Sequence, residues 1–94
     1  MSAPDDAEGR RAVIVHADDN VATLVDQRVE LTRLRDGTPV SPGVPYGHKS
    51  ALRRIEAGAD VVKYGVAIGR ATEAIPPGAH VHVHNVADPE AVSA

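Results

Sequence analysis

Three kinds of short segment in the 94-residue chain carry residue types that bind metals or move protons. The first is His16-Ala17-Asp18-Asp19-Asn20, in which a histidine followed by carboxylates can ligate a metal or orient a substrate. The same residues also fit an Asx-turn, in which an Asp or Asn side chain accepts hydrogen bonds from the nearby backbone. Both interpretations stay open on the residues alone.

The second type of segment occurs twice, as Gly47-His48-Lys49 and as Lys63-Tyr64-Gly65. Glycine permits unusual backbone angles and the close approach of a ligand. A histidine or lysine beside it can bind a carboxylate or exchange a proton, and Lys63 or Tyr64 can act as acid or base. The alternatives are a solvated loop for the first segment and a tyrosine at the edge of the core for the second.

The third segment is His80-Val81-His82-Val83-His84-Asn85, which alternates strictly and predicts a strand. Alternate residues of a strand share a face, so the three histidines would lie on one face and both valines would point into the core. Two such histidines can chelate one transition metal, whereas three would span about 13 Å. The alternative is a polar outer face without a metal.

These segments must be positioned by short strands and turns. The apolar runs Ala12–Val15 and Val21–Val25 have the length of strands, and Val29–Leu34 alternates like a half-buried strand. Asp36-Gly37 predicts a hairpin-type turn. The segment Thr38–Gly47 contains three prolines and two glycines, so we expect a shaped loop.

One pattern repeats after 20 residues. Ile55-Glu56-Ala57-Gly58-Ala59-Asp60-Val61 and Ile75-Pro76-Pro77-Gly78-Ala79-His80-Val81 share the pattern I-x-x-G-x-x-V, and Val44-Pro45-Tyr46-Gly47 is a weaker copy. Each copy predicts an apolar anchor, a glycine turn and a strand. Ser50–Ile55 fits either one helical turn or a twisted strand. The whole pattern predicts a compact, mostly β fold.

Composition limits the classes of protein. A chain of 94 residues forms one domain, here expected over residues 11–86 between a disordered tail at 1–10 and a polar tail at 87–94. Two tyrosines are its only aromatic residues, so the core is light and a covering partner is favoured. The net charge of -3 argues against nucleic-acid binding, and the absence of cysteine excludes disulfides. No signal peptide or membrane span is recognisable, which makes a soluble cytoplasmic protein the default expectation.

The segments resemble a known family in their order along the chain. The domain concerned is the N-terminal SAF-type β-clip domain of altronate and galactarate dehydratases, and the matching segments are His16-Ala-Asp-Asp-Asn-Val-Ala-Thr, Gly47-His-Lys-Ser-Ala-Leu, Val62-Lys-Tyr-Gly, Ile68-Gly-Arg-Ala-Thr and Val81-His-Val-His-Asn. In that family the domain is fused to a large catalytic region or supplied as a small subunit, as in sulfolactate sulfo-lyase. This chain stops after the domain and so resembles the small subunit. The stretch Val25–Gly47 departs from the family pattern and leaves the substrate open.

The resemblance implies a metal-dependent hydro-lyase for sugar acids such as altronate or galactarate. It also implies a divalent metal, for which iron(II) is the first candidate. It implies a large catalytic subunit as partner, and it leaves open whether the chain also forms a homo-oligomer. Its motif positions suggest acid–base or positioning roles for His48, Lys49, Lys63 and Tyr64, substrate contacts for Asp19, Asn20, Gly47 and Asn85, and metal ligation by His16, His82 and His84. His80 stands where the family usually has an apolar residue and is treated as peripheral. The alternatives are a sulfolactate-type sulfo-lyase subunit and a non-catalytic β-clip binding or assembly module.

Overall fold

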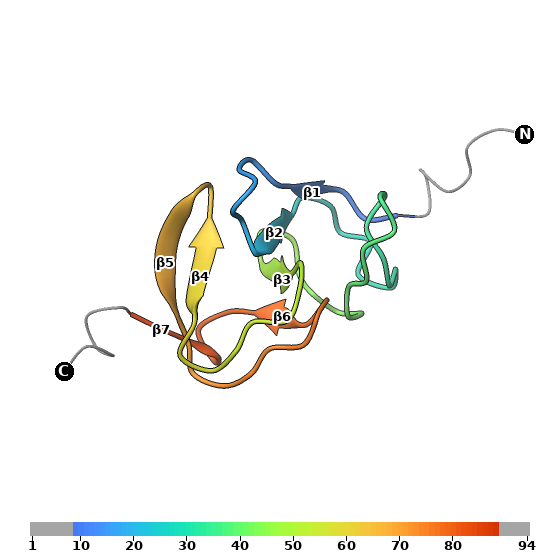
Figure 1. Cartoon of the computed structure of the whole chain (residues 1–94). Coiled ribbons are helices and arrows are strands. Elements are labelled where there is room, and N and C mark those ends of the chain that lie inside the picture. Colours follow the sequence, from blue (N-terminus) through green and yellow to red (C-terminus); the bar gives the residue numbers. More distant parts are fainter. Residues whose placement is uncertain (1–8, 89–94) are drawn as a thin grey trace, which may run out of the picture.

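Short antiparallel strands build the part of the chain that the computed structural model describes, residues 9–88 (Figure 1). The strands are β1 (Ala12–Val13), β2 (Val21–Leu24), β3 (Lys49–Ala51), β4 (Asp60–Lys63), β5 (Val66–Ala71), β6 (His80–Val81) and β7 (Val86–Ala87). They form one sheet of order β1-β2-β3-β6 and another of order β4-β5-β7. The mostly β prediction is therefore confirmed.

The predicted short helical turns are not found. Residues 9–88 contain no helix, and Ser50–Ile55 begins as the end of β3 and continues through a bend. The described residues consequently include no helix that is long and apolar enough to cross a membrane.

The repeated pattern is confirmed as a pair of equivalent turns. Ile55 and Ile75 are both buried and form an isolated antiparallel bridge, in which each amide donates to the other's carbonyl at 2.9 and 2.8 Å. Gly58 and Gly78 follow with φ of 85° and 83°, a left-handed conformation that favours glycine. The two copies therefore meet through their first residues, and β4 and β6 start two residues after the glycines.

The weaker third copy has the same hydrogen bonds. In every copy the amide of the turn glycine donates to a strand residue that is distant in sequence: Gly47 to Leu24, Gly58 to Ala71 and Gly78 to Ala51, at 2.7 to 2.8 Å. Gly47 also has a positive φ, 83°, and β3 starts two residues later. One turn-and-strand device thus supplies three strands, and two of these, β3 and β6, pair directly.

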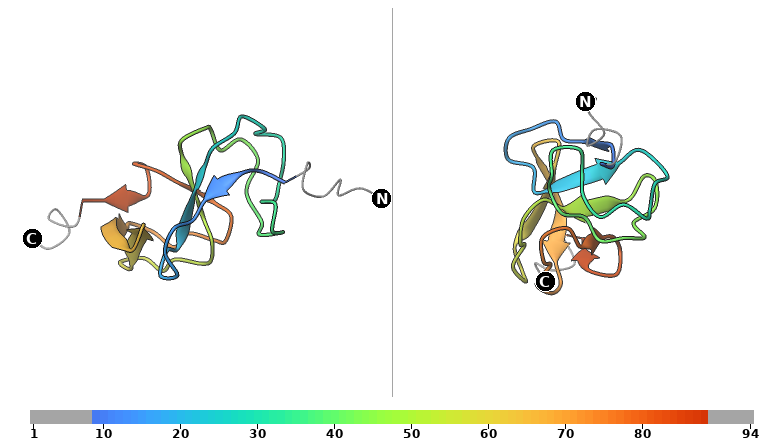
Figure 2. Two further views of the ribbon diagram at one scale, coloured as in Figure 1. Left: turned by 90° about the horizontal axis from the view of Figure 1, so that it is seen from above. Right: turned by 90° about the vertical axis from the view of Figure 1, so that its right-hand side faces the viewer.

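The β2–β3 pair separates two small cores, because neighbouring residues on a strand point to opposite faces. Val21 and Ala51 belong to a cluster that also contains residues of the β4–β5 hairpin and both repeated isoleucines. Ala22 and Leu24 belong to a cluster with Leu34, Val40 and Val44. These last three lie in the long loop, residues 25–48, which joins β2 to β3. The long loop and the hairpin accordingly lie on opposite sides of the four-stranded sheet (Figures 1 and 2).

Two strand predictions were wrong. Val29–Leu34 lies in the long loop, where Val29 and Leu31 donate to carbonyls two and three residues back, so the backbone turns instead of extending. Only isolated bridges remain, including Arg33 to Pro39 around the predicted turn at Asp36-Gly37, where Gly37 has φ 93°. The second error concerns His80–Asn85. Its strand ends at Val81, and the next four residues form a bend and a turn, so Val83 is 81% exposed instead of buried.

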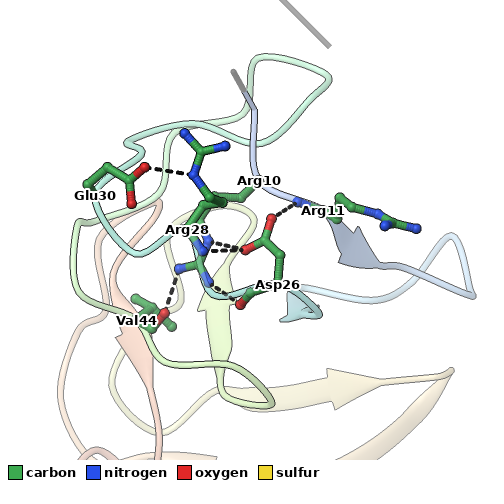
Figure 3. A network of polar contacts seen from close by, with 6 residues as sticks. All are labelled: Arg10, Arg11, Asp26, Arg28, Glu30 and Val44. Atoms are coloured by element: carbon green, nitrogen blue, oxygen red, sulfur yellow. Dashed lines mark hydrogen bonds and ion pairs between the residues drawn. The ribbon is translucent and has the colours of Figure 1, made fainter. Parts of the chain in front are cut away.

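The N-terminal boundary also needs correction, because Arg10 is fully buried and not part of a tail. Its guanidinium donates to the Asp26 side chain and main-chain carbonyl, each at 2.9 Å, and to the Val44 carbonyl (Figure 3). Asp26 also accepts from the amides of Arg11 and Arg28. This network ties the start of β1 to the long loop. The C-terminal boundary at residue 86 needs the same correction, because Ala87 belongs to β7 and pairs with Arg70. The tail predictions for residues 1–8 and 89–94 lie outside the described residues.

Candidate functional site

Three half-buried histidines meet where β3 and β6 pair. His48 Nδ1 and His80 Nε2 share a hydrogen bond 2.8 Å long. The ring of His82 stacks on that of His48, with centroids 4.0 Å apart and planes inclined by 18°. One ring nitrogen from each histidine lies within 4.8 Å of the other two. We call these three residues the histidine cluster.

The repeated turn explains two of the three positions. His48 directly follows Gly47, and His80 is the first residue of β6, paired in register with Ser50. The strands run antiparallel, but because β3 is only three and β6 only two residues long, their first residues still lie close together. His80, which the resemblance treats as peripheral, therefore stands in the middle of the cluster. The repeat itself was the available signal, since it aligns His80 with the start of β3.

Asn85 explains the third position. Its side chain is 4% exposed, its amide donates to the His80 carbonyl, and its oxygen accepts from the His82 amide, both at 2.9 Å. These bonds close a turn that replaces the predicted strand and folds His84 back toward His80, with ring centroids 5.2 Å apart. The predicted separation of about 13 Å across three histidines therefore does not occur. Asn85, predicted to contact substrate, directs its amide group to the backbone.

Burial and surrounding positive charge favour the neutral forms of His80 and His82. Burial lowers the pKa of His80, and the charges of His48, His84, His82 and Lys49 lower it further. Burial together with His48, Lys49 and His84 also lowers the pKa of His82. Neutral imidazole is the form that ligates metals. The lowered pKa values of His80 and His82 therefore favour the form of these two rings that can ligate a metal.

A groove of about 310 Å³ opens beside the cluster. Its lining residues are Lys49, Ile68, His82, Val83, Val86, Ala87 and Asp88. Burial lowers the pKa of the Lys49 ammonium, and the charge of Lys63 lowers it further. A lysine with a lowered pKa is more readily a base at neutral pH. The groove therefore combines apolar walls with one amine, one imidazole and one carboxylate.

Lys63 and Tyr64 lie at the tip of the β4–β5 hairpin. Tyr64 and Gly65 form its two-residue loop with φ of 56° and 77°, the signs required by a type I′ turn. The Lys63 ammonium lies 4.9 Å from the centroid of the Tyr64 ring, within the range of a cation–π contact. Tyr64 is 45% exposed, so its hydroxyl group is accessible from outside the fold.

The first motif lies apart from the histidine cluster and contacts the turn of the β4–β5 hairpin, and the side chains of Asp19 and Asn20 are hydrogen-bonded. Asp19 is 2% exposed and accepts from the amides of Val15, His16 and Gly65. Burial alone would raise its pKa, but these hydrogen bonds outweigh burial and lower the pKa. Asn20 similarly bridges Asp60 and Val62 of β4. These contacts favour the Asx-type interpretation over substrate contacts.

His16, a predicted metal ligand, is exposed and separate from the cluster. Its Nδ1 accepts from the Asp18 amide at 3.1 Å, and its ring lies over the hairpin turn, where a Cβ added to Gly65 would be 2.9 Å from it. The structure therefore brings together His48, Lys49, Lys63, His82, His84 and the unexpected His80, while His16, Asp19 and Asn20 form a different corner.

Comparisons with known proteins find similar sequences over most of the chain. The family model of the altronate/galactarate dehydratase SAF domain matches residues 10–89. The (2R)-sulfolactate sulfo-lyase subunit alpha of Chromohalobacter salexigens is 39% identical, and the match covers 78% of this chain and 89% of that subunit.

Two Escherichia coli enzymes match the chain over a small part of their own length. Altronate dehydratase is 45% identical over 76% of this chain, and galactarate dehydratase (L-threo-forming) is 42% identical over 82% of it. In each case the match covers 15% of the enzyme. The chain thus spans almost a whole subunit of one relative and a small part of the others.

Proposed function

Because the chain belongs to the altronate/galactarate dehydratase SAF domain family, we propose that it is the small subunit of a metal-dependent lyase that dehydrates sugar acids such as altronate or galactarate. The active site is completed by a separate large subunit. The observation that carries this proposal is the histidine cluster beside Lys49 on an open groove. A domain with only a structural role has no use for this set of side chains.

The proportions of the relatives support a partner. The homologous region is 89% of a protein named as a subunit, yet 15% of the two dehydratases. The groove is walled on its outer side by exposed apolar side chains, among them Val83 at 81% exposed and Ile68 at 38%. Covering them with a second protein removes apolar surface from water and encloses the groove, which favours association.

The chemistry proposed is removal of a proton next to the substrate carboxylate, followed by loss of a β-hydroxyl. Neutral Lys49 accepts the α-proton at Nζ, the C–H electron pair forms the carbon–carbon double bond, and the hydroxide leaves. Tyr64 is the candidate donor of the proton that converts hydroxide to water. The ammonium of Lys63 attracts the substrate carboxylate, and the lowered pKa of Lys49 is consistent with the part of a base.

The cofactor proposed for this reaction is a divalent metal, and iron(II) is the first candidate. The donor set fits such an ion, because imidazole nitrogen suits iron, cobalt, nickel and zinc. A bound metal ion supplies positive charge that stabilises the enolate-like intermediate. His48, His80 and His82 are the residues that would hold it, in place of the predicted set of His16, His82 and His84.

A sulfolactate-type sulfo-lyase subunit is the second candidate, and the match to nearly the whole subunit alpha favours it specifically. The same proton abstraction would then expel sulfite instead of hydroxide. A non-catalytic β-clip module is the third candidate. It would need neither a large partner with lyase activity nor the histidine cluster.

The test is gentle purification of the tagged chain from its host, followed by mass spectrometry and assays of the complex on hexarates, hexonates and sulfolactate with added iron(II). We expect a much larger protein in stoichiometric amount and turnover of one substrate class. Sulfite release on sulfolactate alone would select the second candidate. A chain that emerges alone, or a complex inactive on the whole panel, would contradict the lyase proposal.

A further inference from the structure

We infer that His48, His80 and His82 form a divalent transition-metal site built entirely within this one chain, so that the ion binds before any larger subunit does. The inference rests on the proposed function only for its biological use. What carries it is geometry, since the three ligand nitrogens lie within 4.8 Å of one another. Neither His16 nor His84 belongs to this group.

The nitrogen positions are close to those of a coordinated ion. With metal–nitrogen bonds of about 2.0–2.1 Å, neighbouring ligand atoms lie roughly 3 Å apart. His48 Nδ1 and His80 Nε2 are 2.8 Å apart, which is close to that separation. A ring nitrogen of His82, whose ring stacks on that of His48, lies within 4.8 Å of a ring nitrogen of each. Rotation of the rings would aim the three nitrogens at one ion. Binding therefore replaces one imidazole–imidazole hydrogen bond with three metal bonds.

The donor types indicate which ions fit. The cluster offers three imidazole nitrogens and no carboxylate. Calcium and magnesium prefer oxygen ligands, whereas iron, cobalt, nickel and zinc accept imidazole. Because neutral ligands leave the full charge on the ion, the open positions would attract an anionic group. The groove beside His82 gives a carboxylate access to those positions.

The surroundings hold the ligands in place, as metal sites require. Asn85 is buried and bonds to the backbone of both His80 and His82, which fixes two ligands through one side chain. Ser50 pairs with His80 in register and is fully buried, and its hydroxyl has no hydrogen-bond partner within residues 9–88. Metal-bound histidines usually donate their second ring N–H to a neighbouring oxygen. The Ser50 hydroxyl is available for that bond.

The test measures metal binding by the full chain alone, without activity. The chain is treated with chelator and titrated with zinc by calorimetry and with cobalt(II) by visible absorption. We expect one ion per chain and cobalt bands characteristic of nitrogen ligation. His80→Ala should weaken binding by more than 100-fold, since a lost ligand exceeds the 10–100-fold typical of outer groups. His16→Ala is the matched control and should bind normally, and His84→Ala should lose less than His80→Ala.

Outcomes that overturn the inference are distinct from failure of the proposed function. No binding of zinc or cobalt at millimolar concentration, or loss of binding in His16→Ala but not in His80→Ala, would overturn it. Circular dichroism checks that each variant folds. Nickel(II) broadening of the His48, His80 and His82 ring signals by NMR tests the same site in the unmodified chain. Absence of a large partner, by contrast, would contradict the lyase proposal and leave the metal site intact.

Discussion

Two turns of this small domain are each closed by one buried polar side chain, but only one of them presents groups that could bind a ligand. The first turn, residues 15–20, is closed by buried Asp19, and the histidine turn, residues 80–85, is closed by buried Asn85. In the first turn, backbone amides take up both oxygens of Asp19. In the histidine turn, Asn85 satisfies the backbone and leaves imidazole nitrogens of His80 and His82 near a groove. A side chain whose hydrogen bonds all go to the backbone, such as Asp19, has a structural role. Several imidazoles that converge beside a groove indicate a binding site.

The largest expected effect is a difference in enzyme activity between a variant beside the histidine cluster and a variant in the first turn. Lys49→Met in the assembled lyase removes the proposed base, so turnover should fall by roughly 10²- to 10⁴-fold, the range for general acid–base catalysis. The fold should persist, because methionine keeps the apolar part of this half-buried side chain. His16→Ala, in the first turn, is the control and should keep near-normal turnover. Equal losses in both variants would erase the distinction.

The second effect concerns the residues that close each turn. Asn85→Ala removes two hydrogen bonds to buried backbone, with a cost of about 1–3 kcal/mol of stability, and should weaken zinc binding by roughly 10–100-fold. Asp19→Ala should lower the melting temperature as well but leave zinc affinity unchanged at temperatures where the chain is folded. Calorimetry on both variants measures the two quantities together. A zinc defect in Asp19→Ala would show that the turns are coupled.

The repeat made much of the fold predictable. Ile55 and Ile75 were expected as anchors before glycine turns, and local chemistry suffices there because positive φ strongly favours glycine. Val29–Leu34 was not predictable in the same way. Its alternation is typical of a strand, but a strand also needs a neighbour to pair with, and the backbone turns within this segment.

The site was predictable in its residue types and not in its grouping. His48, Lys49 and His82 were selected from the sequence and lie together. His80 was set aside because the family usually has an apolar residue at that position, and His16 was included because it matches the first motif. Neither criterion shows which distant turns meet. The error over His80–Asn85 has one cause: an alternating segment was assigned to a strand, whereas the Asn85 side chain stabilises a turn.

The third effect is the response to acid, to which Asp19 of the first turn should contribute. Although burial tends to raise the pKa of Asp19, its backbone hydrogen bonds lower the pKa from the ordinary 3.8. A lowered folded-state pKa means that this stabilisation is complete above the ordinary value and is lost as pH falls through the folded pKa. Unfolding measured by denaturant below about pH 5 should therefore show a slope that Asp19→Asn reduces. Asn85→Asp, in contrast, should destabilise the fold at neutral pH, because its new carboxylate cannot donate to the His80 carbonyl.

The smallest effect tests whether the partner covers one turn and not the other. Each turn exposes a valine, Val15 at 65% and Val83 at 81%, but only Val83 borders the groove. Val83→Asp should weaken association with the large subunit by about tenfold, which corresponds to roughly 1.4 kcal/mol. Val15→Asp is the matched control, and both variants should keep their stability within about 0.5 kcal/mol, as exposed positions usually do. Surface plasmon resonance with the co-purified large subunit gives both affinities. If Val15→Asp is the weaker binder, the partner covers the first turn, and the groove beside the histidine cluster is open to solvent in the complex.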